Sequence, residues 1–236
     1  MKRVKKRWII AGVVVLVIVA AILFVTMGLP YIRRHFMTNT GNVQEIVSGE
    51  DKISTDKRIL TVYFTRVGNS TFEEAVDAVS SASLLTDGGQ LYGNSQLLAM
   101  MVQDIAGGDI YAIQTKKKYS SGYGDSTQEA RNELTNNERP ALTSGPIDPS
   151  QYDTIVLVFP VWWGTYPMPV ASFLDQYDFS GKEILPIVTN GGSSFGNSLE
   201  DLKENYKGDF KEGLAVYDDE VKEARKKIVP WLKNVL

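Results

Sequence analysis

Short apolar runs alternate with longer helix-like stretches through most of this 236-residue chain. Runs rich in β-branched and aromatic residues predict five strands, over Ile59–Phe64, Asp109–Gln114, Thr154–Phe159, Glu183–Val188 and Leu214–Tyr217. The stretches between and after them predict helices over Ser95–Ala106, Ser126–Asn136, Val170–Tyr177, Ser198–Tyr206 and Asp218–Leu232. Strands that alternate with helices imply an α/β fold with a parallel, doubly wound sheet.

Polar residues mark where several of these helices are expected to begin and end. Ser95, Ser126 and Asp218 are predicted N-caps, because a short polar side chain can accept a hydrogen bond from the first turn. Pro230 is predicted to perturb the end of the last helix, since proline lacks the N–H that a helix interior needs.

The most apolar segment lies near the N-terminus. Ile9 to Leu29 contains no charged residue, and at 1.5 Å per residue these 21 residues span about 31 Å, enough to cross a bilayer core. A cluster of five Lys and Arg residues precedes it within residues 2–7, which predicts the N-terminus inside the cell and the rest outside. A cleaved signal peptide is the alternative, but its apolar region is usually shorter and ends in a small-x-small site.

The chain therefore divides into four predicted parts. Residues 1–7 form a cytoplasmic basic segment, and residues 8–30 a transmembrane helix or uncleaved signal anchor. Residues 31–57 are predicted to be a linker, because they are polar and lack apolar periodicity. Residues 58–236 are long enough to bury one core as a single domain. The predicted location is the cell membrane, with a single pass and an extracytoplasmic domain.

Charge and composition exclude several classes of function. The chain has 25 Lys and Arg residues and 28 Asp and Glu residues. Residues 1–58 contain 10 of the basic and 4 of the acidic residues, which leaves 15 basic and 24 acidic residues in 59–236. The net charge of residues 59–236 is therefore −9. An acidic domain argues against nucleic acid as a partner, which needs a basic face. Zero cysteines exclude disulfides and thiol catalysis, and His35 alone leaves little for a metal site, so no metal is expected.

A pair of adjacent tryptophans follows the most apolar strand, in the segment Pro160-Val161-Trp162-Trp163-Gly164. Consecutive side chains of an extended chain point in different directions, so at least one indole should stand at the rim of the sheet. Open α/β sheets bind ligands at that rim. An aromatic platform beside a glycine suits a flat ring system, and a flavin is the first hypothesis.

Two further polar loops leave the same predicted edge. Thr65 to Thr71 follows the first strand and is rich in hydroxyls, which together with backbone N–H groups can bind a phosphate. Thr189 to Ser198 follows the fourth strand and contains Gly191 and Gly192. Neither a P-loop nor a Gly-x-Gly-x-x-Gly dinucleotide motif is present in the first loop.

With these motifs the chain resembles the flavodoxin family over about residues 58–234. The resemblance lies in the segments 63–70, 152–155, 159–164, 167–170 and 189–193, of which Phe159-Pro160-Val161-Trp162-Trp163-Gly164 is the specific one. It implies a flavodoxin-like five-stranded sheet of order 2-1-3-4-5 with FMN as the cofactor. The candidate cofactor-binding residues are Thr65, Arg66, Asn94, Ser95, Pro160, Val161, Trp162, Trp163, Gly164, Thr189, Asn190, Gly191 and Gly192.

One insertion departs from the short family pattern. Phe72 to Tyr92 stand between the first loop and a second Gly93-Asn94-Ser95, which directly precedes the predicted helix. Either Thr65–Thr71 forms the whole phosphate loop, or the loop is split between Thr65-Arg66 and Gly93-Asn94-Ser95. The split loop is favoured, because phosphates bind at helix N-termini. Residues 73–82 could form a small extra helix.

Several candidate residues have a competing structural role. Arg66 could be a surface charge rather than a phosphate ligand, and the hydroxyls of Thr65, Ser95 and Thr189 could form caps or turns. Trp162 is expected to pack under the sheet edge, which leaves Trp163-Gly164 as the expected contact with the flavin ring. Gly191 and Gly192 are expected to offer backbone N–H groups to the pyrimidine side of the ring.

Three functions remain open at this stage. The first is a membrane-tethered FMN protein that passes electrons to or from a membrane or extracellular partner, such as a redox protein or a quinone. The second is an NAD(P)H or quinone oxidoreductase on the same fold, and the third is a flavin-free interaction module. No acid–base catalyst is predicted, because the cofactor carries the redox chemistry.

Overall fold

A mainly parallel sheet organises the part of the chain that the computed structural model describes, residues 41–72, 83–87 and 89–236. Its strands follow the order β4-β1-β5-β6-β7, and β8 also pairs with β6. All these pairs are parallel. The strands are β1 (Ile59–Tyr63), β4 (Asp109–Ala112), β5 (Thr154–Pro160), β6 (Glu183–Asn190), β7 (Asp209–Phe210) and β8 (Leu214–Tyr217).

The sheet differs from the predicted five strands at one edge. The short strand β7 pairs with the start of β6, where Glu183 lies opposite Asp209. Further along, β8 pairs with the end of β6, where Ile187 lies opposite Leu214. The fifth position of the predicted order 2-1-3-4-5 is therefore divided between two strands.

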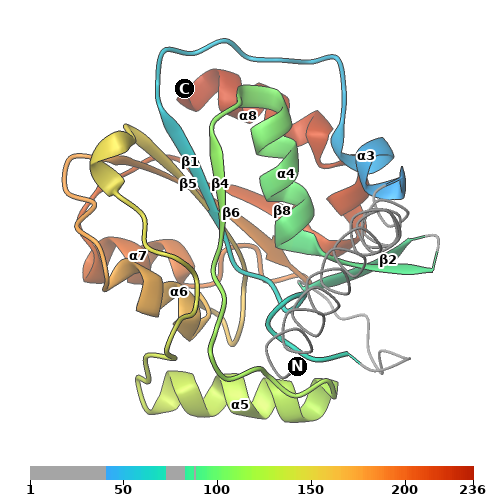
Figure 1. Cartoon of the computed structure of the whole chain (residues 1–236), viewed down its shortest axis with the longest axis vertical. Helices are drawn as coiled ribbons and strands as arrows, with labels where there is room; N and C mark the ends of the chain where they lie inside the picture. Colours follow the sequence, from blue (N-terminus) through green and yellow to red (C-terminus); the bar gives the residue numbers. More distant parts are fainter. Residues whose placement is uncertain (1–40, 73–82, 88) are drawn as a thin grey trace, which may run out of the picture. The chain divides into compact units, whose positions relative to one another are not determined.

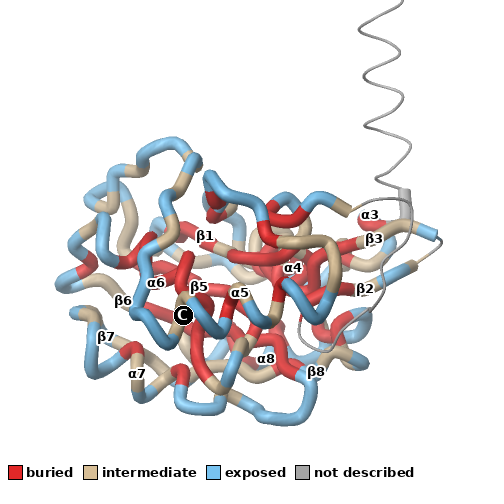
Figure 2. The backbone as a smooth tube through the Cα atoms, turned by 90° about the horizontal axis from the view of Figure 1, so that it is seen from below, coloured by how far each residue is buried: buried red, intermediate tan, exposed pale blue. Residues whose placement is uncertain are grey.

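Helices cover both faces of the sheet (Figure 1). They are α4 (Asn94–Ala106), α5 (Tyr123–Thr135), α6 (Met168–Leu174), α7 (Ser198–Asn205) and α8 (Arg225–Val235), with short 3₁₀ helices η2 (Pro149–Gln151) and η3 (Asp218–Glu223). α4 packs on β1 and β5 and contacts α8. On the other face, α6 and α7 contribute Phe173 and Leu202 to a core that includes Leu60 and Leu157 of the strands. Figure 2 shows buried segments along β1, β5 and α4.

The predicted helix caps are wrong in detail. α4 begins at Asn94 with Gly93 as its extended N-cap, so Ser95 lies inside the first turn. Ser126 also lies inside a first turn, since α5 begins at Tyr123. The last predicted helix is broken into η3 and α8, and Pro230 therefore lies inside α8 rather than near its end.

The insertion after the first loop ends in a hairpin that the strand pattern did not predict. β2 (Leu84–Asp87) pairs antiparallel with β3 (Gln90–Gly93), and β3 runs directly into α4. The hairpin thus decides where the N-terminus of α4 stands. The helix expected over residues 73–82 lies outside the described residues.

Part of the predicted linker belongs to the domain. Residues 45–236 form one compact unit, and the boundary with residues 1–44 falls within α3 (Gly41–Val47). The Ile53 N–H donates to the Ile105 carbonyl at 2.8 Å. Arg225 donates to the carbonyls of Val47 and Asp51 and pairs with Asp104 at 2.7 Å. Residues 45–53 are therefore fixed to the α4–α8 face, although their sequence lacks an apolar period.

No helix within residues 41–72, 83–87 and 89–236 is long and apolar enough to cross a membrane. The predicted anchor at residues 8–30 lies outside these ranges and stays a prediction.

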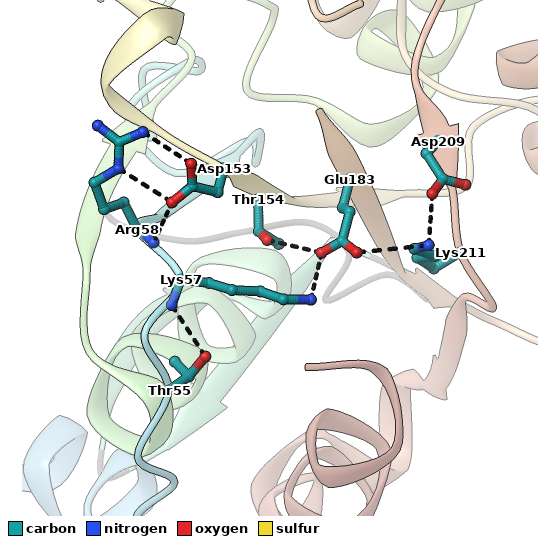
Figure 3. A network of polar contacts seen from close by, with 8 residues as sticks. All are labelled: Thr55, Lys57, Arg58, Asp153, Thr154, Glu183, Asp209 and Lys211. Carbon is teal, nitrogen blue, oxygen red and sulfur yellow. Dashed lines mark hydrogen bonds and ion pairs between the residues drawn. The ribbon is translucent and has the colours of Figure 1, made fainter. Parts of the chain in front are cut away.

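Charged side chains tie together the amino ends of the central strands (Figure 3). Arg58, just before β1, pairs with Asp153, just before β5, at 2.8 Å. Glu183, the first residue of β6, accepts hydrogen bonds from Lys57 and from the Thr154 hydroxyl. Lys211 lies 3.5 Å from the other oxygen of Glu183. This network therefore stabilises the amino edge of the sheet, opposite the edge at which the strands end.

The network predicts a loss of stability in acid. The hydrogen bond from Lys57 holds the pKa of Glu183 below its ordinary value of 4.5. A carboxylate with a lowered folded-state pKa stabilises the fold above its unfolded pKa, and this contribution is lost as the pH falls through the folded pKa. The unfolding free energy can be measured by urea unfolding at a series of pH values. Between about pH 5 and about pH 2, it should fall less in Glu183→Gln than in the wild-type chain, by up to about 1 kcal/mol. Glu204→Gln on α7 is the control, and an equally reduced fall in both variants would contradict the role of Glu183.

Candidate cofactor site

The carboxyl ends of β1, β5 and β6 gather three polar loops at one sheet edge. Tyr63 at the end of β1 lies opposite Val158, and Pro160 at the end of β5 lies opposite Thr189. The Val161 N–H donates to the Thr189 carbonyl at 2.8 Å, so the β5 and β6 loops leave the sheet side by side. The predicted loops therefore meet where a ligand of an open α/β sheet is expected.

Two segments distant in sequence meet at the N-terminus of α4. A Cβ atom on Gly93 would lie 2.2 Å from the Thr65 Oγ1, so the β1 loop touches the start of the helix. The Ser95 Oγ lies 3.4 Å from the Thr189 Oγ1, which links the same helix end to β6. The structure thus brings Thr65, Asn94, Ser95 and Thr189 together, as the split phosphate loop requires.

Asn94 is the most informative residue of this cluster. Its side chain is completely buried, and both of its polar atoms, Oδ1 and Nδ2, lack a hydrogen-bond partner among the described residues. An unpaired buried amide costs stability. The N–H of Asn94 donates to the Ser83 carbonyl, and the next N–H groups of the first turn have no partner within the helix. These donors at the positive end of a helix fit a phosphate group.

Asn69, by contrast, is fully used by the fold. Its Nδ2 donates to the carbonyls of Thr65 and Ile113, and its Oδ1 accepts from the Thr115 N–H at 2.7 Å. The side chain therefore joins the β1 loop to the end of β4. This arrangement argues against residues 65–71 as the whole phosphate loop, because the Asn69 amide is already bonded to backbone groups of the fold.

Arg66 is not the surface charge that was considered as its alternative role. Only 3% of the residue is exposed, so the surface-charge interpretation is wrong. One guanidinium nitrogen donates to the carbonyls of Ser120 and Ser121, the latter at 2.9 Å, and the group lies 5.3 Å from the Phe72 ring centroid. Arg66 thus binds the loop before α5, which leaves its predicted phosphate contact a prediction.

The two tryptophans lie on a tight turn with unusual backbone angles. The N–H and carbonyl of Trp162 bond to the carbonyl and N–H of Thr165 at 2.9 and 3.1 Å. Trp163 and Gly164 between them have φ values of 52° and 82°. Positive φ at both central positions defines a type I′ turn, which glycine adopts freely and tryptophan does not. The Trp163 backbone is therefore strained at the sheet edge.

The two indoles have different environments. Trp162 packs edge-on against Phe64 and Tyr119, with ring centroids 5.3 and 5.5 Å apart, and its Nε1 donates to the Ser83 Oγ at 2.9 Å. Trp163 is 49% exposed, and its Nε1 donates to the Thr127 carbonyl of α5. Trp162 is thus partly buried and packs against the core at the sheet edge, and Trp163 presents a ring surface at the rim.

A half-buried carboxylate lies next to Tyr119, which packs against Trp162. The Tyr119 hydroxyl donates to the Glu133 carboxylate at 2.6 Å. Burial raises the pKa of Glu133 above its ordinary value, and burial together with the Glu133 charge raises the pKa of the Tyr119 phenol. The pair anchors the ring that supports Trp162.

The third loop is organised by Asn190. Its Nδ2 donates to the Val216 carbonyl of β8, and its Oδ1 accepts from the N–H groups of Gly192 and Ser194 at 2.9 and 3.0 Å. Asn190 is therefore a structural residue of the loop. The expectation that the Gly192 N–H faces the ring does not hold in this structure, because Asn190 already accepts from it. Gly191 and Gly192 are exposed beside the tryptophan turn.

Sequence reasoning missed Ser83. This buried residue lies at the base of the β2–β3 hairpin and contacts both the helix end and Trp162. The sequence does contain a signal for the hairpin, since Gly88-Gly89 separates two short apolar runs and Gly-Gly is a favoured two-residue connection.

Comparisons with known proteins identify the family. A model of the flavodoxin family matches residues 90–235, more than half of the chain, so this chain belongs to the flavodoxin family. FMN is accordingly its cofactor. No curated protein matches it in sequence.

Solved structures share the fold. A protein of Bacteroides uniformis ATCC 8492, described as a flavoprotein, is 26% identical, with 76% of this chain and 99% of that chain covered and a TM-score of 0.58. A similar protein of Bacteroides eggerthii DSM 20697 is 24% identical, with 74% and 99% covered and a TM-score of 0.54. A flavoprotein of Lactobacillus acidophilus NCFM in complex with FMN is 19% identical, with 71% and 97% covered and a TM-score of 0.49.

The two asparagines make a matched pair of predictions. Asn94→Ala should leave the unfolding free energy of the flavin-free chain unchanged or slightly higher, because it removes an unpaired buried amide. The same change should weaken FMN binding about tenfold. Asn69→Ala should lower the unfolding free energy by about 2–4 kcal/mol, because it leaves several buried backbone groups unpaired. Urea unfolding and FMN titration of the purified chains measure both effects, and an equal loss of stability in the two variants would show that Asn94 has a structural partner.

Proposed function

We propose that this chain is an electron carrier that binds FMN through the N-terminus of α4 and the tryptophan turn. The single observation that supports this proposal best is Asn94, a buried and unpaired amide at a helix N-terminus. A fold gains nothing from such a group, whereas a phosphate ester could accept its Nδ2–H and the neighbouring backbone N–H groups.

The phosphate would lie among Thr65, Asn94 and Ser95. The two hydroxyls and the amide can donate, and the positive end of the thirteen-residue helix favours a dianion. The hydroxyl of Thr65 donates a long hydrogen bond of 3.4 Å to the Ser83 carbonyl, and such a weak bond can be exchanged for one to a ligand.

The ring would lie against the Trp163-Gly164 turn, between the β5 and β6 loops. Gly164 has nothing within 4 Å of the place where a Cβ would stand, so a flat group can approach the backbone there. The Trp163 indole is half exposed and is held by Thr127 and by the guanidinium of Arg131, 4.9 Å from the ring centroid. A held aromatic surface can stack on another ring with little loss of side-chain entropy.

The residues around the site bind and orient rather than react. When bound, FMN supplies one-electron or two-electron redox chemistry. Trp163 would shield one side of the ring from water, and Asn190 fixes the shape of the β6 loop. An electron carrier needs no proton donor beyond the cofactor, which agrees with a site that is built from aromatic, hydroxyl and amide groups.

Flavin binding is the direct test of this proposal. The purified full-length chain should turn yellow with FMN, and Trp163→Ala should weaken FMN binding about tenfold or more, because stacking of a planar ring is worth about 1–3 kcal/mol. Trp162→Ala should weaken FMN binding much less and instead lower the unfolding free energy of the flavin-free chain, by about 2–3 kcal/mol, because a partly buried ring that packs against the core is lost. Flavin fluorescence titration and urea unfolding measure the two effects. Equal losses of affinity would contradict the ring assignment, and a colourless chain without FMN affinity would favour a flavin-free module.

An oxidoreductase is distinguished from a carrier by turnover. Steady oxidation of NADH or NADPH by the FMN-loaded chain with a quinone acceptor would favour the enzyme. Slow reduction without turnover, followed by fast electron transfer to a protein acceptor, is the result expected of a carrier.

We further propose that residues 8–30 anchor the chain in the cell membrane, with the flavodoxin-family domain outside. The charge-free run and the basic cluster before it support this proposal. The electron partner would then be a neighbour at the membrane, such as a redox protein or a quinone.

Protease treatment of intact cells tests the topology. External protease should degrade the domain without lysis, while a cytoplasmic control protein stays intact. If the domain is protected until the cells are lysed, the predicted orientation is wrong. If the chain is recovered in the soluble fraction, the predicted anchor is wrong.

A further inference from the structure

Ser83 lies where the two ends of the proposed cofactor site meet. It directly precedes β2, and the pairing of Leu84 with Gly93 places it at the base of the hairpin, opposite the first residue of α4. Only 5% of Ser83 is exposed. It is separated from Thr65 by 18 residues and from Trp162 by 79, so the insertion alone brings it here.

One side of Ser83 binds the phosphate end of the site. Its carbonyl accepts the N–H of Asn94 at 3.0 Å and the Thr65 hydroxyl at 3.4 Å. The first turn of α4 is therefore held to the Ser83 peptide group, and the β1 loop is attached to it only by the long bond from Thr65. A movement of the first turn of α4 when a phosphate binds would therefore move Ser83.

The other side of Ser83 binds the ring end. Its Oγ accepts the indole N–H of Trp162 at 2.9 Å. Trp162 is the first residue of the type I′ turn that carries Trp163 and Gly164, and its backbone makes both hydrogen bonds that close the turn. The position of the Trp162 indole is thus coupled to the turn on which the ring would lie.

We propose that Ser83 is a positioning residue that couples phosphate binding at α4 to the placement of the tryptophan turn. This inference rests on the proposed function, since it concerns the same FMN site. Without the link, the phosphate and the ring would contribute independently to affinity. With the link through Ser83, a phosphate that orders the N-terminus of α4 also orders the tryptophan turn. The flavin ring then binds to a turn that is already ordered, so phosphate and ring binding are cooperative.

The comparison of FMN with riboflavin, which lacks the phosphate, measures this coupling. The quantity is the ratio of the riboflavin dissociation constant to the FMN dissociation constant, determined by fluorescence titration of the purified full-length chain. Ser83→Ala should lower this ratio about fivefold, the equivalent of one hydrogen bond. Trp162→Phe removes the same hydrogen bond from the other side and should lower the ratio by a similar factor. The double variant should show about the same fivefold loss, not the product of the two.

A matched control separates coupling from a general loss of stability. Ser172 on α6 is also a buried serine, and its hydroxyl donates to the Met168 carbonyl within the helix at 3.1 Å. Ser172→Ala should leave the ratio unchanged. Because Trp162→Phe tests the link independently, the result does not depend on the folding of Ser83→Ala.

The outcomes distinguish the two proposals. Suppose that the wild-type chain binds FMN. The coupling role of Ser83 is then overturned, while FMN binding stands, if both single variants keep the wild-type ratio of dissociation constants. The same holds if the effects of the two single variants multiply in the double variant. If the wild-type chain binds neither flavin, the proposed function is overturned and this inference with it.

Discussion

Hydrogen bonds between the parallel strands β1, β5 and β6 hold the framework on which every other feature of this protein depends. They align the strands so that all carboxyl ends lie at one edge and all amino ends at the other. Charged residues close the amino edge, where Glu183 joins Lys57 and Lys211. Polar and aromatic loops leave the carboxyl edge. Stability and ligand binding are thus assigned to opposite ends of the same strands.

At the carboxyl edge the fold keeps two features that cost stability. Asn94 is buried without a hydrogen-bond partner among the described residues, and Trp163 has a φ of 52°, which a tryptophan rarely adopts. Backbone strain and unpaired buried groups concentrate at functional sites, where a ligand can compensate for them. Both features stand on the loops that the FMN proposal uses, one at the phosphate end and one at the ring end. Their presence together favours a binding edge over a purely structural one.

The sequence allowed the α/β class and the five main strands to be predicted, because runs such as Thr154–Phe159 are apolar on both faces and leave no other interpretation. It also predicted the different environments of Trp162 and Trp163, since adjacent side chains must diverge. It did not reveal the partners of polar side chains. Asn69, Arg66 and Asn190 look alike as loop residues, yet tertiary contacts alone decide that each binds backbone groups. The hairpin and Ser83 were missed because their strands are only four residues long, and the attachment of residues 45–53 depends on Arg225, which is distant in sequence.

The central claim is that the N-terminus of α4 holds the phosphate of FMN, and ³¹P NMR of the FMN-loaded chain tests it most directly. A free phosphate monoester takes up a proton with a pKa near about 6, whereas the helix end and its N–H donors favour the dianion. The account predicts that the ³¹P shift of bound FMN stays constant between about pH 5 and about pH 8, while that of free FMN moves. A bound phosphate that titrates like free FMN would lie in solvent, and the assignment of the phosphate to Asn94 and α4 would be wrong.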